Sequence, residues 1–137
     1  MRPGSLLALA TASIAVLGPW NPLVAGEPVP KPLTPVEARK KVGESIQVEF
    51  TVKGAKDRLE KRGEIYLDAE LDFRDEKNFA AVINREGAFH FENKGVKDFE
   101  QHFRGKTIRV KGVVTVVDEV PRIEISDSNQ LEFVEQK

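Results

Sequence analysis

The stretch TIRVKGVVTVVDEVPRIEI, residues 107–125, decides how this chain folds. Apolar residues occupy every second position along it, on both sides of a short turn at 118–121. Such alternation is typical of a strand with one face in a core and the other in water. With the turn at 118–121, Val116 faces Ile123, and the apolar face continues from one strand to the next. The pattern therefore predicts a β-hairpin.

The residues before the hairpin predict three further strands. Apolar alternation or short apolar runs place them at 45–53, 64–70 and 79–84. Between the first two, the charged segment 54–63 is bounded by glycines and is either a flexible loop or a loop with one turn of helix. Residues 85–104 lose the two-residue period, and we expect two short helices there.

A short helix precedes the first strand. Thr34 is a good N-cap, Pro35 suits the first helical position, and Glu37 completes a capping box. We expect Val36 and Val42 to close one end of the core.

The order of these elements is that of a five-stranded Greek-key barrel, the OB-fold. The predicted fold class is therefore all-β, a barrel with capping helices over residues 34–134, followed by a tail at 135–137. A last extended segment at 131–134 lies against the barrel. The predicted core consists of Ile46, Val48, Phe50, Ile65, Leu67, Phe79, Ile83, Phe99, Phe103, Ile108, Val110, Val114, Val116, Ile123 and Ile125.

Three stretches also resemble known families. VGESIQVEFTVKG, NFAAVIN and HFRGKTIRVKGVVTVVDEVPRIEISDSNQLE are similar to the secreted bacterial branch of the tRNA-anticodon-like, nucleic-acid-binding OB-fold families. The arrangement is also similar to the periplasmic bacterial OB-fold (BOF) proteins. The resemblance covers about residues 34–134 and rests on fold-forming motifs, so it implies the fold more than an activity.

The N-terminus is predicted to be a signal peptide, residues 1–26. Arg2 precedes an apolar run at 6–17 that is too short for a membrane span, and small residues favour cleavage before Glu27. A proline-rich linker at 27–33 follows. We expect an exported protein, periplasmic or secreted, with no membrane attachment after cleavage; an uncleaved anchor is the alternative.

Composition sets limits on function. The chain has no cysteine, which excludes disulfides, thiolate chemistry and cysteine-based zinc sites. Its net charge is −1, and without Arg2 it has 20 basic and 22 acidic residues, a net charge of −2. Proteins that bind nucleic acid usually carry a basic excess, so the overall charge argues against such a partner.

OB-folds usually bind ligands on strands two and three, between the loops that flank this face. The candidate residues in the first loop are Lys56, Arg58, Lys61 and Arg62, which either track a phosphate backbone or form a solvated charged surface. The second loop opens with an Asp-Glu pair that repels phosphate.

Two aromatic residues and a second basic patch complete the candidate ligand-binding set. Tyr66 lies on the outward side of its strand and either stacks on a base or packs on the surface. Phe73 either stacks on a base or anchors its loop in the core. Arg109 and Lys111 share the outward side of the fourth strand.

The sequence offers little for catalysis. Asp72, Asp75 and Glu76 match no calcium-loop spacing, and we predict neither a metal site nor a cofactor. His90 and His102 are expected to be partly buried helix residues.

The leading prediction is a non-enzymatic binding module for single-stranded nucleic acid. The alternative is a BOF-like structural or interaction module that binds a protein or a small cationic ligand. A degenerate nuclease-type enzyme is a third hypothesis.

Overall fold

The strands of residues 31–135, the part of the chain that the computed structural model describes, form one sheet of seven strands. The elements in chain order are α1 (Pro35–Ala38), β1 (Ser45–Thr51), β2 (Gly54–Arg58), α2 (Leu59–Arg62), β3 (Glu64–Asp68), β4 (Ala80–Asn84), α3 (Arg85–Asn93), α4 (Phe99–Phe103), β5 (Thr107–Val117), β6 (Val120–Ile125), η2 (Ser128–Gln130) and β7 (Leu131–Phe133). None of the helices in this range is long and apolar enough to cross a membrane. The predicted signal peptide lies outside the described residues, as do the start of the linker and the end of the tail.

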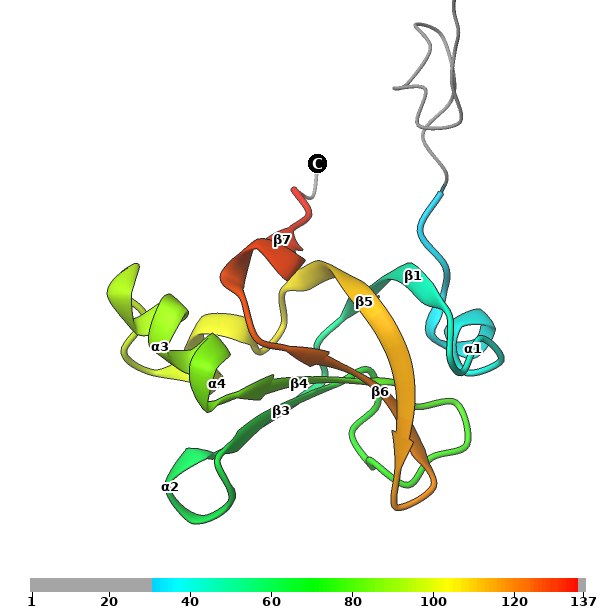
Figure 1. The fold of residues 1–137 in the computed structure, drawn as a ribbon, viewed down its shortest axis with the longest axis horizontal. Helices are drawn as coiled ribbons and strands as arrows, with labels where there is room; N and C mark the ends of the chain where they lie inside the picture. Colours follow the sequence, from blue (N-terminus) through cyan, green and yellow to red (C-terminus); the bar gives the residue numbers. More distant parts are fainter. Residues whose placement is uncertain (1–30, 136–137) are drawn as a thin grey trace, which may run out of the picture. The chain divides into compact units, whose positions relative to one another are not determined.

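The sheet closes into a barrel because β1 and β2 are two halves of one bent strand. Figure 1 shows the long, curved β5 running from the side of β7 to β6. The strand order is β1-β5-β6-β4-β3-β2, so its two ends are joined through residues 52 and 53. The Val52 N–H donates to the Lys106 carbonyl next to β5, whereas the Lys53 N–H donates to the Asp68 carbonyl in β3. With β1 and β2 counted as one strand and β4 parallel to β6, this is the predicted five-stranded OB-fold barrel.

The segment predicted as a loop at 54–63 is a strand followed by a helical turn. Its first half pairs with β3, and Ala55 is buried in the core. The loop prediction is wrong there because Lys56 and Arg58, which point outward, mask the alternation of a very short strand. The second half is α2, which ends at Gly63 in the left-handed conformation with φ 73°.

The β5–β6 hairpin has the predicted apolar face but a tighter turn. Asp118 and Glu119 form a two-residue turn with φ values of 52° and 67°, as a type I′ turn requires. Val114 consequently pairs with Ile123, two residues away from the predicted register. A shift of two residues leaves every side chain on its predicted face.

Val116 was predicted in the core and is 47% exposed, so that prediction is wrong. The reason is the length of the hairpin: β4 pairs with β6 only from Arg122 onward, and the pairs nearest the turn extend beyond the barrel. Val114, which has the same parity, is completely buried.

β5 takes part in both sides of the barrel. Its first half pairs with β1 and β7, and its second half pairs with β6. Gly112 stands between them, where a Cβ atom would lie 2.6 Å from the Ile123 Cγ2 atom. Only glycine permits this close approach of the two strands. β7 is the extended segment predicted at 131–134.

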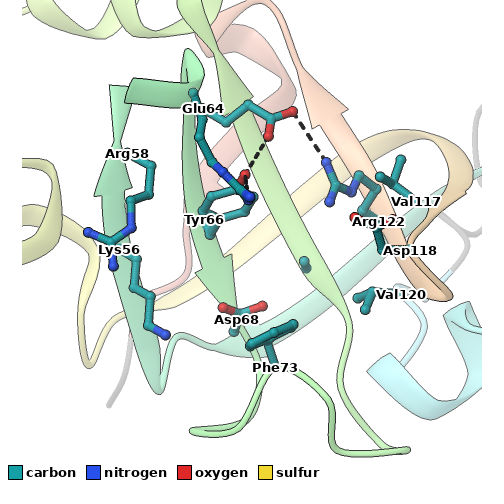
Figure 2. A pocket seen from close by; sticks show the side chains of 12 residues that line it. Lys56, Arg58, Glu64, Tyr66, Asp68, Phe73, Val117, Asp118, Val120 and Arg122 are labelled. Atoms are coloured by element: carbon teal, nitrogen blue, oxygen red, sulfur yellow. Dashed lines mark hydrogen bonds and ion pairs between the residues drawn. The ribbon is translucent and has the colours of Figure 1, made fainter. Parts of the chain in front are cut away.

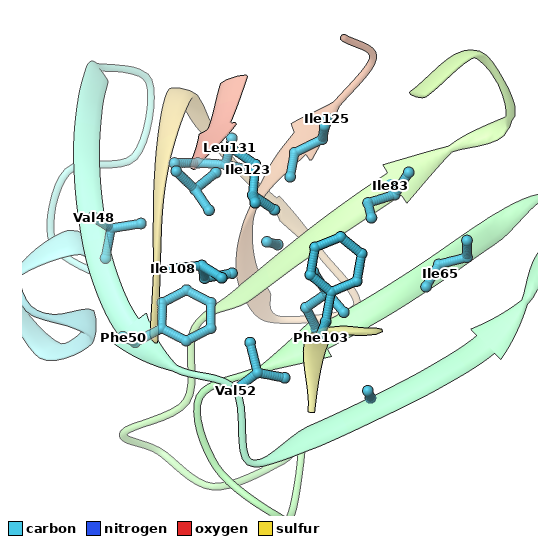
Figure 3. Close-up of a cluster of buried hydrophobic side chains, with 14 of the residues drawn as sticks. Val48, Phe50, Val52, Ile65, Ile83, Phe103, Ile108, Ile123, Ile125 and Leu131 are labelled. Carbon is cyan, nitrogen blue, oxygen red and sulfur yellow. The ribbon is translucent and has the colours of Figure 1, made fainter. Parts of the chain in front are cut away.

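The inside of the barrel is filled by the predicted core, except for the exposed Val116 and for Ile46, which is only partly buried and packs against the core (Figure 3). The two helices predicted for 85–104 are α3 and α4, and they close one end with an aromatic cluster. The Phe91 ring packs edge-to-face on Phe99 and Phe103, with centroids 6.5 and 5.5 Å apart. Gly87 in α3 allows the helix to approach β6, because a Cβ atom there would clash with the Ile125 carbonyl.

The predicted capping box of α1 is present. The Glu37 N–H donates to the Thr34 hydroxyl oxygen, and the Thr34 N–H donates to the Glu37 carboxylate. Val36 and Val42 are exposed, however, so the prediction that they close one end of the core is wrong. The residue that α1 buries is Ala38, because a single turn of helix can direct only one side chain into the core.

Candidate functional site

A pocket of about 290 Å³ lies on the outer face of β2, β3 and β6 (Figure 2). α2 and the β5–β6 turn contribute to its rim, and the loop 69–79 contributes Phe73. This is the face that the OB-fold prediction singled out. The pocket is lined by Lys56, Arg58, Arg62, Glu64, Tyr66, Asp68, Phe73, Ala80, Val117, Asp118, Val120 and Arg122.

β3 presents three polar side chains to the pocket at alternate positions, namely Glu64, Tyr66 and Asp68 (Figure 2). The Tyr66 hydroxyl donates to the Glu64 carboxylate, and Arg62 Nη1 donates to the hydroxyl oxygen over 3.4 Å. Burial, and then the hydrogen bond to Glu64, raise the pKa of Tyr66. The hydroxyl therefore keeps its proton at neutral pH and remains a donor.

Arg122 covers the middle of this face from β6. Its side chain is only 11% exposed, and its Nη1 atom lies 3.3 Å from Glu64 Oε2. The guanidinium carbon lies 5.8 Å from the centroid of the Tyr66 ring, a cation–π distance. The Nε atom of Arg122 is buried and has no hydrogen-bond partner among the described residues. The site thus tolerates an unused donor, which most buried polar groups avoid.

Phe73 is 42% exposed and lines the pocket. The alternative that it anchors its loop in the core is therefore wrong. Two cations lie near its ring: Lys56 Nζ at 5.6 Å and Arg74 Cζ at 5.2 Å from the centroid. An exposed ring beside cations is suited to stack on a flat, electron-rich ligand.

Asn78 holds the loop that carries Phe73. It is fully buried, and its Oδ1 atom accepts a hydrogen bond from the Glu70 N–H over 2.9 Å. Its Nδ2 atom donates to the Phe73 carbonyl over 3.1 Å and to Asp68 Oδ1 over 3.0 Å. One side chain therefore fixes the loop, the aromatic residue and the Asp68 carboxylate relative to one another.

Asp68 is an acidic residue in an unusually dry position. It is 5% exposed, yet it lines the pocket. Burial raises the pKa of its carboxyl group, while the hydrogen bond from Asn78 and the charges of Lys56 and Arg122 act in the opposite direction.

Three cations surround the pocket without an ion-pair partner within 4.0 Å among residues 31–135: Lys56, Arg58 and Arg62. Lys56 and Arg58 alternate on β2, and Arg62 lies one helical turn after Arg58. With Arg122, four cations face the carboxylates of Glu64, Asp68 and Asp118. Since Glu64 is paired with Arg122, the excess positive charge lies on the β2 and α2 side.

Three predicted site residues lie elsewhere. Lys61 does not line the pocket and contributes, with Glu60 and Arg85, to a separate hollow beside α2. Arg109 and Lys111 belong to the half of β5 that pairs with β1 and are absent from the pocket lining. The structure therefore brings five of the eight candidate residues together at the pocket and leaves these three outside it.

Arg109 is neutralised where it stands. Its Nη2 atom lies 2.9 Å from Glu49 Oε1, and its Nη1 atom lies 3.5 Å from Glu132 Oε2. Both carboxylates come from the residues that face Arg109 on the neighbouring strands β1 and β7.

Sequence reasoning missed Glu64, Asp68, Asn78 and Arg122. A signal existed for the first two, because they share the outward parity of Tyr66. Arg122 follows from the hairpin parity in the same way. Asn78 gave no signal, since a polar residue in a polar loop does not reveal that it is buried.

Two acidic residues of the loop 69–79 and His102 make contacts within the fold. Asp72 and Asp75 each accept a hydrogen bond from a backbone N–H two residues ahead, at 2.9 and 2.8 Å. No group of three acidic or histidine side chains in the described part of the chain is placed to hold a metal ion. Burial, and then the charge of Lys106, lower the pKa of His102, which packs on Phe103 and Phe133.

Comparison with solved structures supports the fold. The chain is similar to OBody AM2EP06 bound to hen egg-white lysozyme (TM-score 0.52, 13% identity, 81% of this chain and 100% of that one). It is also similar to OBody AM3L09 bound to hen egg-white lysozyme (TM-score 0.51, 14% identity, 80% of this chain and 100% of that one). A third similar structure is the asparaginyl-tRNA synthetase from Pyrococcus horikoshii (TM-score 0.50, 13% identity, 77% of this chain).

The chain spans only 23% of the length of that synthetase. No protein-family model and no curated protein sequence matches the chain. At such low identity, the structural similarity establishes the OB-fold and no more.

Proposed function

We propose that the pocket face binds single-stranded nucleic acid, with a base stacked on Phe73 and phosphates held by Lys56, Arg58 and Arg62. The observation that carries this proposal is the exposed Phe73 ring, with Lys56 and Arg74 close to it and unpaired cations beyond. Proteins that bind single strands combine a positively charged groove with aromatic stacking positions in this way.

The negative net charge of the chain does not oppose this binding mode. Exposed charges are screened beyond about 10 Å at 0.1 M salt, so a phosphate responds mainly to the charges around it. Carboxylates such as Glu49 and Glu132 lie with Arg109 on the other side of the barrel. Around the pocket, cations outnumber carboxylates.

The fold is compatible with this partner and with another. Among the similar structures, one is a tRNA synthetase and two are OBodies bound to lysozyme. The fold alone therefore does not choose between nucleic acid and protein, and the proposal rests on the side chains of the pocket.

The proposal is one of binding without catalysis, outside the cytoplasm. Export is supported by the sequence of residues 1–26, with its single charge, short apolar run and small residues. Sequencing the N-terminus of protein produced in a bacterial host tests this part. A first residue of Glu27 is expected, and protein that still carries residues 1–26 would contradict it.

Fluorescence anisotropy tests the binding. The protein from residue 27 is titrated into a labelled thymidine strand of about nine nucleotides at roughly 20 and then 200 mM salt. An abasic strand of the same length is the matched probe. We expect binding that weakens steeply with salt, because released counterions drive it. The abasic strand binds more weakly, because nothing stacks on Phe73.

Two other results would change the conclusion. Equal affinity for both strands would mean that charge alone is recognised and that Phe73 has no role. Absence of binding at low salt would reject nucleic acid as the partner. A protein partner would then be favoured, and the exposed valines Val113, Val116 and Val117 on β5 would be the surface to examine. Gel analysis of the recovered strand, with and without magnesium, tests the absence of catalysis; a shortened strand would contradict it.

A further inference from the structure

Asp68 has a property that phosphate binding does not use. Phosphate is repelled by a carboxylate, yet Asp68 lines the pocket beside the proposed stacking ring (Figure 2). Its side chain is almost completely buried, at 5% exposure, so it is held in place by the fold and does not lie free on the surface.

Asn78 links the Asp68 carboxylate to the backbone of Phe73. Asn78 donates from the same Nδ2 atom to Asp68 Oδ1 and to the Phe73 carbonyl, over 3.0 and 3.1 Å. Asn78 is itself fully buried and is fixed by the Glu70 N–H. A ligand that stacks on Phe73 therefore lies next to the Asp68 carboxylate (Figure 2).

The carboxylate retains unused acceptor capacity. Among residues 31–135, the hydrogen bond from Asn78 goes to Oδ1, and none is made to Oδ2. A carboxylate offers about four lone-pair positions, so it can accept further hydrogen bonds at both oxygens. Among the described residues, Arg122 Nε is the one buried polar side-chain atom without a partner, so Asp68 Oδ2 is open to solvent and a ligand donor can replace water there.

The strands beside Asp68 leave room for a ligand. Its partner on β2 is Gly54, and its partner on β4 is Ala80, which also lines the pocket. Both of these directly paired residues are small, and the large side chains near enough to act on the charge of Asp68 are Lys56 and Arg122.

The chemistry of the bases then selects one of them. A base stacked on Phe73 must offer hydrogen-bond donors at its edge to suit a carboxylate. Guanine has two adjacent donors, N1–H and the 2-amino group. Adenine and cytosine have one amino group next to a ring acceptor, and thymine has one N–H between two carbonyl oxygens. Guanine alone matches the two oxygens of Asp68.

We propose that Asp68 and Phe73 form a guanine-selective position within the single-strand site. This inference rests on the proposed function, because the base must first be brought to Phe73 by a bound strand. Lys56 Nζ, 5.6 Å from the Phe73 centroid, is then close enough to meet a phosphate of the same strand.

Base substitution in the probe tests the proposal on the unaltered protein. The central thymidine of the strand is replaced by guanosine, inosine or adenosine; a single guanosine does not form quadruplexes. The guanosine strand is expected to bind about tenfold more tightly than the all-thymidine strand, since a bidentate base contact has roughly this value. Inosine, which lacks the 2-amino group, falls between the two, and adenosine gives no hydrogen-bond gain.

Asp68→Asn tests the assignment to this residue. An amide offers one acceptor and one donor, so the preference for guanosine is expected to fall to about twofold or less. Affinity for the all-thymidine strand remains, because Phe73 and the cations are unchanged. Glu76→Gln, which changes an exposed carboxylate of the loop 69–79, is the matched control and keeps the preference.

The outcomes separate this inference from the proposed function. Binding of every strand with equal affinity would overturn the guanine position and leave single-strand binding intact. Binding of none would overturn both. A guanosine preference that survives Asp68→Asn would overturn the role of Asp68. The base series needs no variant, so it decides the question even where Asp68→Asn does not fold.

Discussion

The two sides of this barrel carry similar basic residues and use them differently. On the β1–β5–β7 side, Arg109 lies between Glu49 and Glu132, at 2.9 and 3.5 Å. On the pocket side, Lys56 and Arg58 have no such partner among the described residues, and they lie around an exposed aromatic ring. A count of basic residues along the sequence treats these two sides as equal. The difference lies in which cations are already neutralised by a neighbouring strand.

The largest expected effect comes from a substitution that unfolds the whole barrel and therefore both of its sides. Val114 in β5 is completely buried. Val114→Asp places an unpaired charge in the core at a cost of several kcal/mol, comparable with the whole stability of about 5–15 kcal/mol for a domain. We expect an unfolded protein by circular dichroism.

Val116→Asp is the matched control on the same strand and of the same parity. Because Val116 is 47% exposed, the charge stays in water and the protein is expected to remain folded. If both variants unfold, the hairpin is buried farther toward its turn than the structure shows. If both fold, the core does not extend through β5.

Charge reversal distinguishes the two sides directly. Lys56→Glu with Arg58→Glu replaces attraction by repulsion at the pocket, and we expect single-strand affinity at low salt to fall about a hundredfold. The dependence of affinity on salt should become flatter as phosphate contacts are lost. Anisotropy titration at two salt concentrations measures both quantities.

Lys106→Glu with Lys111→Glu makes the same change of net charge away from the pocket. Neither residue lines the pocket, so affinity is expected to change by less than about threefold at 0.1 M salt, where distant charges are screened. Equal losses in the two double variants would show that the strand responds to total charge and not to one side.

The two sides also offer a matched pair of aromatic rings. Phe73 and Phe133 are similarly exposed, and each has a lysine Nζ atom near its ring, at 5.6 and 5.7 Å. Phe73→Ala is expected to weaken binding about tenfold, the value of one stacked base.

Phe133→Ala should leave affinity unchanged and lower thermal stability instead. The Phe133 ring stacks on Phe103 and meets His102 edge-on, with centroids 5.7 and 5.2 Å away, so it belongs to the aromatic cluster at the end of the barrel. If Phe133→Ala weakened binding as much as Phe73→Ala, the ligand would lie on the other side of the barrel.

The sequence predicts the barrel well because alternation survives small errors. The hairpin turn was placed two residues too long, yet Val114 and Ile123 kept their faces, since side chains repeat every two residues. β2 escaped prediction because Lys56 and Arg58 are charged and only Ala55 marks its inner side. The burial prediction fails near the end of a strand: Val116 extends beyond the neighbouring strands and is exposed.

The candidate site was only partly predictable, because the availability of its residues depends on contacts with residues that are distant in the sequence. Tyr66 follows from strand parity, and Lys56 and Arg58 follow from the position of segment 54–63 beside the usual ligand face of the fold. The pairing of Arg109 depends on its cross-strand neighbours Glu49 and Glu132, which no local pattern identifies. The exposure of Phe73 depends on Asn78, whose burial arises from tertiary contacts. Long-range pairing decides which of several similar residues is available.

The smallest expected effect is the loss of folding stability that the buried Asp68 carboxyl group causes when it ionises. Burial raises the pKa of Asp68 above its ordinary value of 3.8. Between pH 3.8 and the raised value, the folded state binds more protons than the unfolded state, so the free energy of unfolding falls as the pH rises. Above the raised pKa the folded state bears the full free-energy cost of ionising the buried carboxyl group, and below pH 3.8 this cost is absent.

Asp68→Asn removes this ionisation and keeps an oxygen that can accept from Asn78 Nδ2. The variant is therefore expected to be more stable than the unaltered protein at pH 7, by about 1 kcal/mol, with an advantage that shrinks on acidification and vanishes below pH 3.8. Denaturant unfolding from pH 3 to pH 7 measures it, with Glu76→Gln as the control for net charge. An advantage independent of pH would mean that the amide improves packing and that ionisation of Asp68 costs nothing. A pH-dependent gain in stability, together with a lost guanosine preference, would show that this side of the barrel keeps a buried charge for binding, whereas the side that holds Arg109 pairs its charges within the fold.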